Sequence, residues 1–237
     1  MANQDLQLQR TRSYHYVFVG FVKFEEILKK LISRMPYYKI TKSSKNNLKE
    51  IFYDVQDNML SNAGIVLSKS LTNKDAFFNI RRLSRVSKRN KKYRLEECNA
   101  EDHPREFAPQ IASAIEHSFS LPLSIDLESI IKKTKPTISL DISKTNYDVV
   151  CGSGYRAKIV YEDVLYQDVA TGKKILQEGM TLVVPNEETQ ETEEILNLID
   201  KYISNLSLYD ASRFEIAQKL LYTEKQDIIA EEEEPQE

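Results

Sequence analysis

The predicted fold depends most on the stretch IFYDVQDNMLSNAGIVLSKS, which covers residues 51–70. Its first part alternates in the manner of a β-strand, with Ile51, Tyr53 and Val55 at every second position. A polar crossing with two aspartates follows, and then Gly64, a residue type that readily adopts the conformations of a turn. The aliphatic run after the glycine predicts a second strand. The stretch therefore predicts two strands joined by a polar connection.

Strand-like alternation recurs on both sides of this unit. The further predicted strands are Ser13–Val19, Asp75–Arg82, Lys92–Cys98, a strand that begins at Pro136, Tyr155–Gln167 and Lys174–Val184. The apolar spacing predicts helices at about 23–35, 104–119, 126–133, 186–206 and 211–222. The polar residues Thr41–Asn47 are predicted to be a connection. This order favours an α+β fold, an antiparallel β-barrel of about eight strands with peripheral helices. An open antiparallel sheet covered by helices is the alternative.

Length and composition favour a soluble, single-domain protein. The chain has 237 residues, of which 41% are hydrophobic and 29% are charged, and its mean hydropathy is -0.48. We expect an N-terminal segment (1–12), one barrel domain (13–222) and an acidic, disordered tail (223–237). No apolar run reaches the about 18 residues of a membrane span, and the N-terminus lacks the apolar core of a secretory signal. The two cysteines, Cys98 and Cys151, show no metal-ligand spacing. A cytoplasmic location is therefore expected.

Basic charge is concentrated in one segment. RRLSRVSKRNKKYR (Arg81–Arg94) holds eight basic residues in fourteen, and clustered Lys and Arg neutralise phosphates of nucleic acid or polyphosphate. Its single aromatic residue, Tyr93, offers little for base stacking. A solvated hairpin tip is the alternative interpretation of this segment.

Four stretches, taken together, resemble the CYTH family of triphosphate tunnel enzymes. The first is the 51–70 unit with its Tyr-Asp-x-x-Asp and Asn-Ala-Gly sequences. Lys144-x-x-Tyr147 is similar to the family's Arg-x-x-Tyr, and residues 157–168 (AKIVYEDVLYQD) to its late strand. Residues 212–221 (SRFEIAQKLL) are similar to its closing helix. The order and spacing of the four agree with the family over about residues 13–222.

The resemblance implies a tunnel whose inward side chains are charged. In that family, Lys and Arg hold the triphosphate of a nucleotide, thiamine triphosphate, or inorganic tri- and polyphosphate. Carboxylates at the tunnel mouth hold Mg²⁺ or Mn²⁺, which positions the attacking water or polarises the phosphoryl group. A polyanion requires several cations, and hard metal ions require oxygen ligands.

This chain departs from the family where the chemistry resides. The first-strand motif Glu-x-Glu-x-Lys falls on Ser13, His15 and Val17. The arginine pair of the second strand is replaced by Ser68 and Ser70. The final Glu-x-Glu falls on Gly179 and Thr181, with Glu178 adjacent but out of phase. The metal-binding acids at both ends of the barrel are therefore missing.

Several charged positions still match the family or share the inward face of its late strand. The residues predicted to bind phosphate are Arg81, Arg94, Lys144, Arg156 and Lys158. Two carboxylates, Glu96 and Glu162, are predicted metal ligands only if the protein is active. His15 occupies the place of a tunnel acid and is interpreted either as a phosphate contact or as a strand histidine.

Three functional hypotheses follow. The preferred one is a non-hydrolytic CYTH-like barrel that binds a phosphate-rich anion (triphosphate, nucleotide or polyphosphate) or a protein partner, and needs no cofactor. The second is a metal-dependent triphosphatase or nucleotidyl cyclase that uses Mg²⁺ or Mn²⁺ at a rearranged site with Glu96, Glu162 and Glu178. The third is a nucleic-acid-binding protein that acts through Arg81–Arg94. The exposed faces of the last two helices are interpreted either as a docking surface for a protein partner or as solvated faces, and no membrane partner is expected.

Overall fold

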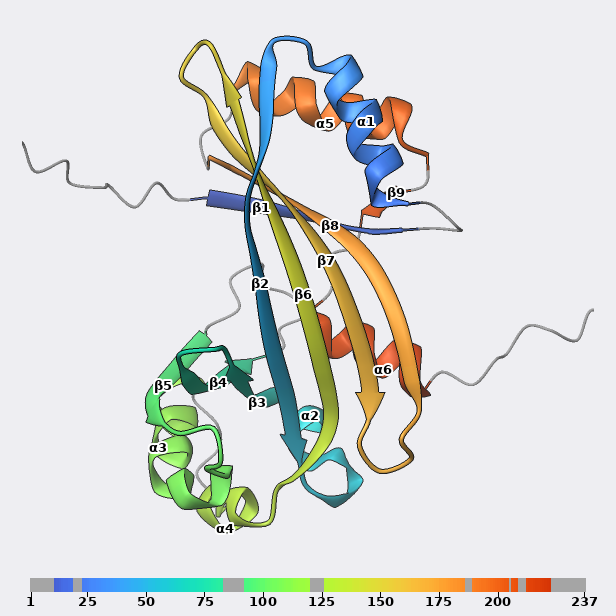
Figure 1. Ribbon diagram of the computed structural model, residues 1–237. Helices are drawn as coiled ribbons and strands as arrows, with labels where there is room; N and C mark the ends of the chain where they lie inside the picture. The colour runs from blue at the N-terminus through green and yellow to red at the C-terminus, as the bar shows by residue number, and fades with distance from the viewer. Residues whose placement is uncertain are drawn as a thin grey trace, which may run out of the picture.

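The computed structural model describes residues 11–18, 23–82, 92–119, 126–185, 189–204, 206–208 and 212–222. In these residues one antiparallel sheet of nine strands runs in the order β5-β4-β3-β2-β6-β7-β8-β1-β9 (Figure 1). The strands are β1 (Thr11–Phe18), β2 (Tyr38–Asp54), β3 (Ile65–Leu71), β4 (Ala76–Arg82), β5 (Lys92–Cys98), β6 (Lys135–Cys151), β7 (Arg156–Asp168), β8 (Lys174–Pro185) and β9 (Leu206–Leu208). The helices are α1 (Phe24–Arg34), α2 (Met59–Asn62), α3 (Ala108–Phe119), α4 (Leu127–Lys132), α5 (Gln190–Tyr202) and α6 (Arg213–Tyr222), and short 3₁₀ turns cover Gln56–Asn58 and Pro104–Phe107.

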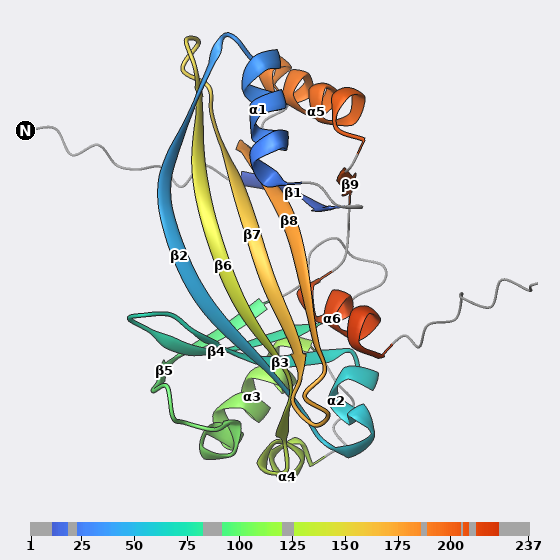
Figure 2. The same cartoon turned by 45° about the vertical axis from the view of Figure 1, so that its right-hand side comes forward.

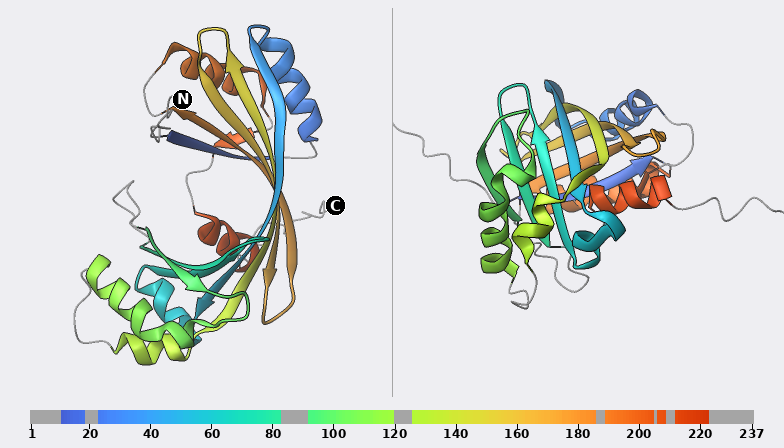
Figure 3. Two further views of the ribbon diagram at one scale, coloured as in Figure 1. Left: turned by 60° about the vertical axis from the view of Figure 1, so that its left-hand side comes forward. Right: turned by 90° about the horizontal axis from the view of Figure 1, so that it is seen from below.

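The sheet curls strongly along its length, so that it has a concave and a convex face (Figures 2 and 3). Helix α6 lies within the curl, and we call the face it covers the concave face. Strands β5 and β9 end the hydrogen-bonded order in the described part of the chain. The expected α+β tunnel fold with peripheral helices is confirmed. Its sheet has nine strands rather than about eight, and in the described part of the chain it is strongly curled but not closed into a barrel by hydrogen bonds.

Three apolar clusters attach the helices to the sheet. On the convex face at one end, buried residues of β1, β7 and β8 pack against α1 and α5, with Phe24, Ile27 and Ile195 among the helical contacts. On the convex face at the other end, β3 and β4 pack against α3 and α4. On the concave face, α6 inserts Phe214 against Phe52 of β2, with ring centroids 5.2 Å apart. The middle of the sheet therefore lies between two helix-covered ends.

The polar residues Thr41–Asn47, predicted to be a connection, belong to strand β2. This strand pairs with β6 from Tyr38 opposite Cys151 to Asp54 opposite Lys135. Both faces of β2 are exposed along this part, so selection for alternating apolar residues is absent there. A test for alternating apolar residues therefore does not detect this part of the strand, although it pairs with β6 on one side.

The 51–70 unit folds around Asp54. This carboxylate is 4% exposed and accepts hydrogen bonds from the backbone N–H groups of Val55, Leu60 and Ser61, at 2.8, 2.9 and 3.0 Å. These bonds seat α2 directly after β2 and compensate the burial of the charge. Gly64, with φ of 74°, then turns the chain into β3. The aspartate that marks the resemblance is thus structural.

Lys69 of β3 lies on the convex face, between two serines that lie on the concave face. Its side chain is 1% exposed, and its ammonium group donates hydrogen bonds to the carbonyl oxygens of Ala100, at 2.9 Å, and Asp102. The ammonium group also lies 5.3 Å from the centre of the Phe78 ring. Burial lowers the pKa of Lys69. The lysine therefore anchors the loop that leads to α3.

We predict that Lys69→Met lowers the free energy of unfolding by about 1–3 kcal/mol, because the thioether fills the space but leaves two carbonyl groups without their donor. Chemical denaturation followed by circular dichroism measures the change. Lys74→Met, at an exposed position after the same strand, is the control. Equal stabilities of the two variants would contradict the anchoring role.

Candidate anion-binding face

The hydrogen-bond register determines which side chains share the concave face. Directly opposed residues of an antiparallel pair point to the same side, and side chains alternate along each strand. Lys144 of β6 is opposite Glu162 of β7, Asp148 is opposite Lys158, and Val150 is opposite Arg156. These residues form one face because they are spaced by two. It is the face on which Val164 and Tyr166 of β7 contact α6.

The same rule extends the concave face across β2 to β5. Glu50 of β2 is opposite Ser70 of β3 and Leu140 of β6. Ser68 is opposite Asn79, and Asn79 is opposite Arg94. The residues predicted to bind phosphate therefore all lie on the concave face: Arg81, Arg94, Lys144, Arg156 and Lys158. The structure brings them to one surface, and their binding role stays a prediction.

The concave face has an open end and an enclosed end. At the open end, behind α1 and α5, Arg156 and Lys158 are exposed, and Lys39 joins them because it is opposite Val150. Arg94 is exposed too, and its guanidinium lies 3.5 Å from the centre of the Phe77 ring. The cations of the enclosed end, Arg81, Lys144 and Arg213, are paired with carboxylates.

Glu162 is the centre of the enclosed end. Its Oε1 accepts from Lys144 Nζ at 2.9 Å and from Arg213 Nη2 at 2.6 Å, and its side chain is 14% exposed. Burial alone would raise the pKa of Glu162, but Arg213 and Lys144 lower it to about 2. For Arg213, burial by itself would lower the pKa, but the neighbouring charge of Glu162 raises the pKa above its ordinary value. The carboxylate thus ties α6 to β6 and β7.

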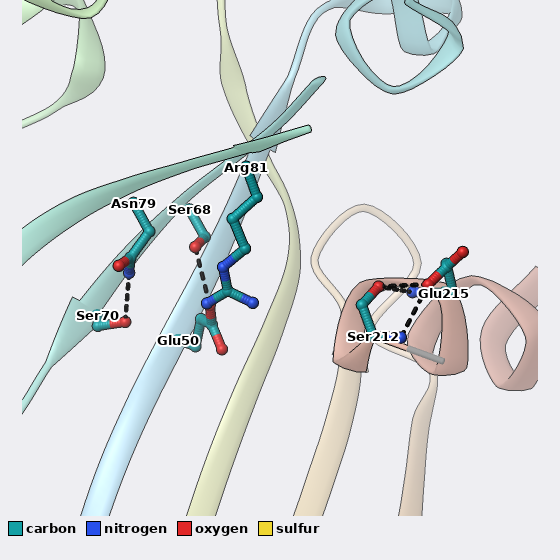
Figure 4. Close-up of polar contacts among 7 residues, drawn as sticks. All are labelled: Glu50, Ser68, Ser70, Asn79, Arg81, Ser212 and Glu215. Carbon is teal, nitrogen blue, oxygen red and sulfur yellow. Dashed lines mark hydrogen bonds and ion pairs between the residues drawn. The ribbon is translucent and has the colours of Figure 1, made fainter. Parts of the chain in front are cut away.

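A second buried carboxylate, Glu50, holds Arg81 (Figure 4). Its Oε1 accepts from Arg81 Nη2 at 2.9 Å and from Ser68 Oγ at 2.8 Å, and its side chain is 1% exposed. Asn79 donates to Ser70 Oγ at 2.9 Å. Ser68 and Ser70 are therefore both hydrogen-bond partners of neighbouring side chains. Two atoms here, Asn79 Oδ1 and Arg81 Nε, are buried and have no hydrogen-bond partner among the described residues.

A cavity of about 220 Å³ lies between the N-terminus of α6 and strands β1, β7 and β8. Its lining includes the charged residues Arg81, Glu162, Glu178 and Arg213 and the polar residues His15, Gln177, Thr181 and Ser212. His15 Nδ1 and Thr181 Oγ1 are 2.9 Å apart and hydrogen bonded. The predicted inward placement of His15 and Thr181 agrees with this lining.

Gly179 is part of the cavity wall. It is opposite both Glu162 and Val17, and a Cβ atom at this position would lie 2.8 Å from the carbonyl oxygen of Tyr16. The absence of a side chain therefore lets β1 pack closely against β8.

The predicted metal ligands do not form a site in the described residues. Glu178 accepts a hydrogen bond from Tyr161 at 2.9 Å, on the convex face, while Glu162 lies on the concave face and is held by two cations. Glu96 lies in β5, but its side chain is outside the described part. No group of three or more His, Cys, Asp or Glu side chains gathers there. The donor set that is described does not fit Mg²⁺ or Mn²⁺.

Sequence reasoning missed three members of the face: Lys39, Glu50 and Arg213. Counting the strand period of two back from Phe52 would have found Glu50. No local signal identifies Arg213, because it meets a residue 51 positions earlier in the chain.

Several predictions fall outside the described residues. Positions 83–91 of the basic segment, the N-terminal residues 1–10 and the tail 223–237 belong to this group.

Cys98 and Cys151 are both free thiols. None of the described helices is long and apolar enough to cross a membrane.

Comparison with known proteins supports the fold. No protein-family model matches the chain, and no curated protein matches it in sequence. Among solved structures, it is similar to HpAC1 from Hippeastrum, a candidate adenylyl cyclase with a dominant triphosphatase activity. The TM-score is 0.51 and the identity 10%, over 87% of this chain and 94% of that one. A candidate adenylate cyclase from Bacillus halodurans gives a TM-score of 0.45 at 13% identity, over 87% and 95%. The resemblance to CYTH-like tunnel proteins is thus confirmed at the level of fold.

We predict that stability falls as pH decreases from about 5 towards 2. The pKa of Glu162 is lowered from 4.5 to about 2 in the folded protein, so its contribution of about 3 kcal/mol is complete above the unfolded pKa and is lost as pH falls through the folded pKa. Thermal unfolding across this pH range measures it. Glu162→Gln should be less stable at pH 7, and its stability should change less with pH over this window. A dependence of stability on pH as steep as that of the unchanged chain would refute the assignment.

Proposed function

We propose that this protein is a non-hydrolytic tunnel-fold module that binds a phosphate-rich anion (a triphosphate, a nucleotide or polyphosphate) on its concave face. The observation that supports this most strongly is the gathering of cations on that one face. Lys39, Arg94, Arg156 and Lys158 are exposed there, and Arg81, Lys144 and Arg213 lie deeper. The acids that the register places on this face are fewer: Glu50, Asp148, Glu162 and Asp168.

An excess of positive charge on a concave surface favours anions for two reasons. The summed potential raises the local concentration of anionic ligands, and the curled walls keep bulk water at a distance. Exposed lysine and arginine side chains can also rotate to follow a flexible ligand. This arrangement supports binding without requiring one fixed geometry.

The lack of hydrolysis is proposed from the carboxylates. Phosphoryl transfer in this fold family uses acids that hold a divalent cation. Here Glu162 accepts from Lys144 and Arg213, and Glu50 accepts from Arg81 and Ser68. Releasing either carboxylate to a metal ion would leave partly buried cations unpaired, which is unfavourable. A metal-dependent triphosphatase or cyclase remains the rival hypothesis.

We predict that the double variant Arg156→Gln/Lys158→Gln weakens tripolyphosphate binding about five- to thirty-fold, because each exposed charge contributes about 0.5–1 kcal/mol. Isothermal titration calorimetry at fixed ionic strength gives the affinities. The control is Lys29→Gln/Lys30→Gln, which removes the same charge from exposed positions of α1. Equal affinities of the two variants for tripolyphosphate would contradict binding on the concave face.

A second assay tests hydrolysis. The protein is incubated with tripolyphosphate, thiamine triphosphate, ATP and polyphosphate in Mg²⁺ or Mn²⁺, and released phosphate is measured against Glu162→Gln. We expect equal, background rates. Release well above that of the variant would establish the rival, enzymatic hypothesis.

A further inference from the structure

An open groove of about 440 Å³ lies on the convex face, on the side of the sheet opposite to the cations. Its lining includes Asp163 and Leu165 of β7, which alternate with Glu162 and therefore point away from the concave face. Helices α1 and α5 lie at one end of the molecule and α3 and α4 at the other (Figure 2). With the residues opposite them, the two β7 residues form what we call the convex groove: Lys49, Asp141, Asp163, Leu165 and Leu176.

The apolar part of the convex groove is exposed. Leu165 and Leu176 are directly opposed, and neither belongs to an apolar cluster of the described residues. Leu176 is 60% exposed, although it lies within strand β8. At the two ends of the convex face, helices cover the apolar residues of the strands. Apolar side chains left uncovered in a groove are typical of an interaction site.

The carboxylates around these leucines lack cations. Lys49 lies 4.0 Å from Asp141, but Asp163 has no ion pair within the described part of the chain, and its Oδ1 is buried without a hydrogen-bond partner there. The charges that line the groove therefore leave one negative charge in excess. Glu178, directly opposite Asp163 and beside the groove, accepts only from the Tyr161 hydroxyl group. Like charges directly opposed on a sheet are destabilising, so this pair favours an added cation.

The two neighbouring acids of β7 differ in how they are compensated. Glu162 on the concave face is held by Lys144 and Arg213, whereas no described residue of this chain compensates Asp163 on the convex face. A buried carboxylate oxygen without a donor is unfavourable, and a donor from another molecule would relieve it. A guanidinium group is suited to this position because it combines several N–H donors with a positive charge.

From the exposed leucines and the uncompensated carboxylate we infer that the convex groove binds a segment of a partner protein that presents an arginine next to apolar side chains. The arginine lies beside Asp163, and the apolar side chains pack on Leu165 and Leu176. A free polyamine is a poorer match, because it carries several positive charges and the groove has one negative charge in excess. The groove is on the opposite face from the proposed anion site, so the two proposals are independent.

Nuclear magnetic resonance titration of the isotope-labelled protein tests this binding with three peptide amides as probes: acetyl-Leu-Arg-Leu, acetyl-Leu-Gln-Leu and acetyl-Ala-Arg-Ala. We expect the chemical shift changes to be confined to the convex groove. Leu-Arg-Leu should bind about two- to five-fold more tightly than either of the other peptides, because each of these lacks either the ionic or the apolar contact.

Two variants locate the contacts. Asp163→Asn should remove the preference for arginine over glutamine, and Leu176→Ser should remove the preference for leucine over alanine. Asp163→Asn should not lower the melting temperature, because it removes a charge that opposes Glu178, whereas loss of a merely structural residue would lower it. Glu193→Gln, at an exposed position of α5, is the control and should change neither preference.

The contrary outcomes are equally specific. Equal affinities of Leu-Arg-Leu and Leu-Gln-Leu would overturn the inference, and so would chemical shift changes on another surface or none with any peptide. Spermidine at the same ionic strength is the fourth probe. If it bound as tightly as Leu-Arg-Leu and was weakened equally by Asp163→Asn, the groove would be a polyamine site and the protein partner would be refuted.

Discussion

The shared carboxylate of Glu162 is the interaction on which the arrangement of the concave face depends. It lies in the middle strands of the sheet, where a carboxylate is stable only when cations surround it. One of those cations, Lys144, comes from the neighbouring strand, and the other, Arg213, opens the last helix. The ion pair between Glu162 and Arg213 therefore determines where α6 packs on the sheet. Apolar contacts such as Phe214 on Phe52 then stabilise the helix there, but they do not by themselves specify its direction.

In the proposed function, an anionic ligand would meet cations that the protein already pairs internally. Glu50 and Glu162 neutralise charge on Arg81, Lys144 and Arg213. The ligand would have to bind these cations more favourably than the two carboxylates, which are part of the chain and lose no translational freedom on pairing. Such internal pairing would lower affinity and raise discrimination, because only ligands of matching charge and shape replace the internal pairs favourably.

Much of this could be predicted from the sequence, because strand alternation is a local property. The period of two placed Arg156, Lys158 and Glu162 on one face and Lys69 on the other, and the register bears out both placements. The partners of the charged groups could not be predicted in the same way. Arg81 and Glu50 are 31 positions apart, and Arg213 and Glu162 are 51 apart, so their contacts arise only when the sheet curls. The exposed part of β2 was missed because neither of its faces is buried.

The close approach of β1 to Gly179 also bears on how this chain can change over evolutionary time. A glutamate at position 179 would bring its Cβ to 2.8 Å from the Tyr16 carbonyl oxygen, a backbone atom that cannot rotate away. Any side chain at position 179 therefore requires β1 to shift as well. A substitution here is tolerated only together with a change in β1, so position 179 and the β1 backbone at position 16 can vary only as a pair.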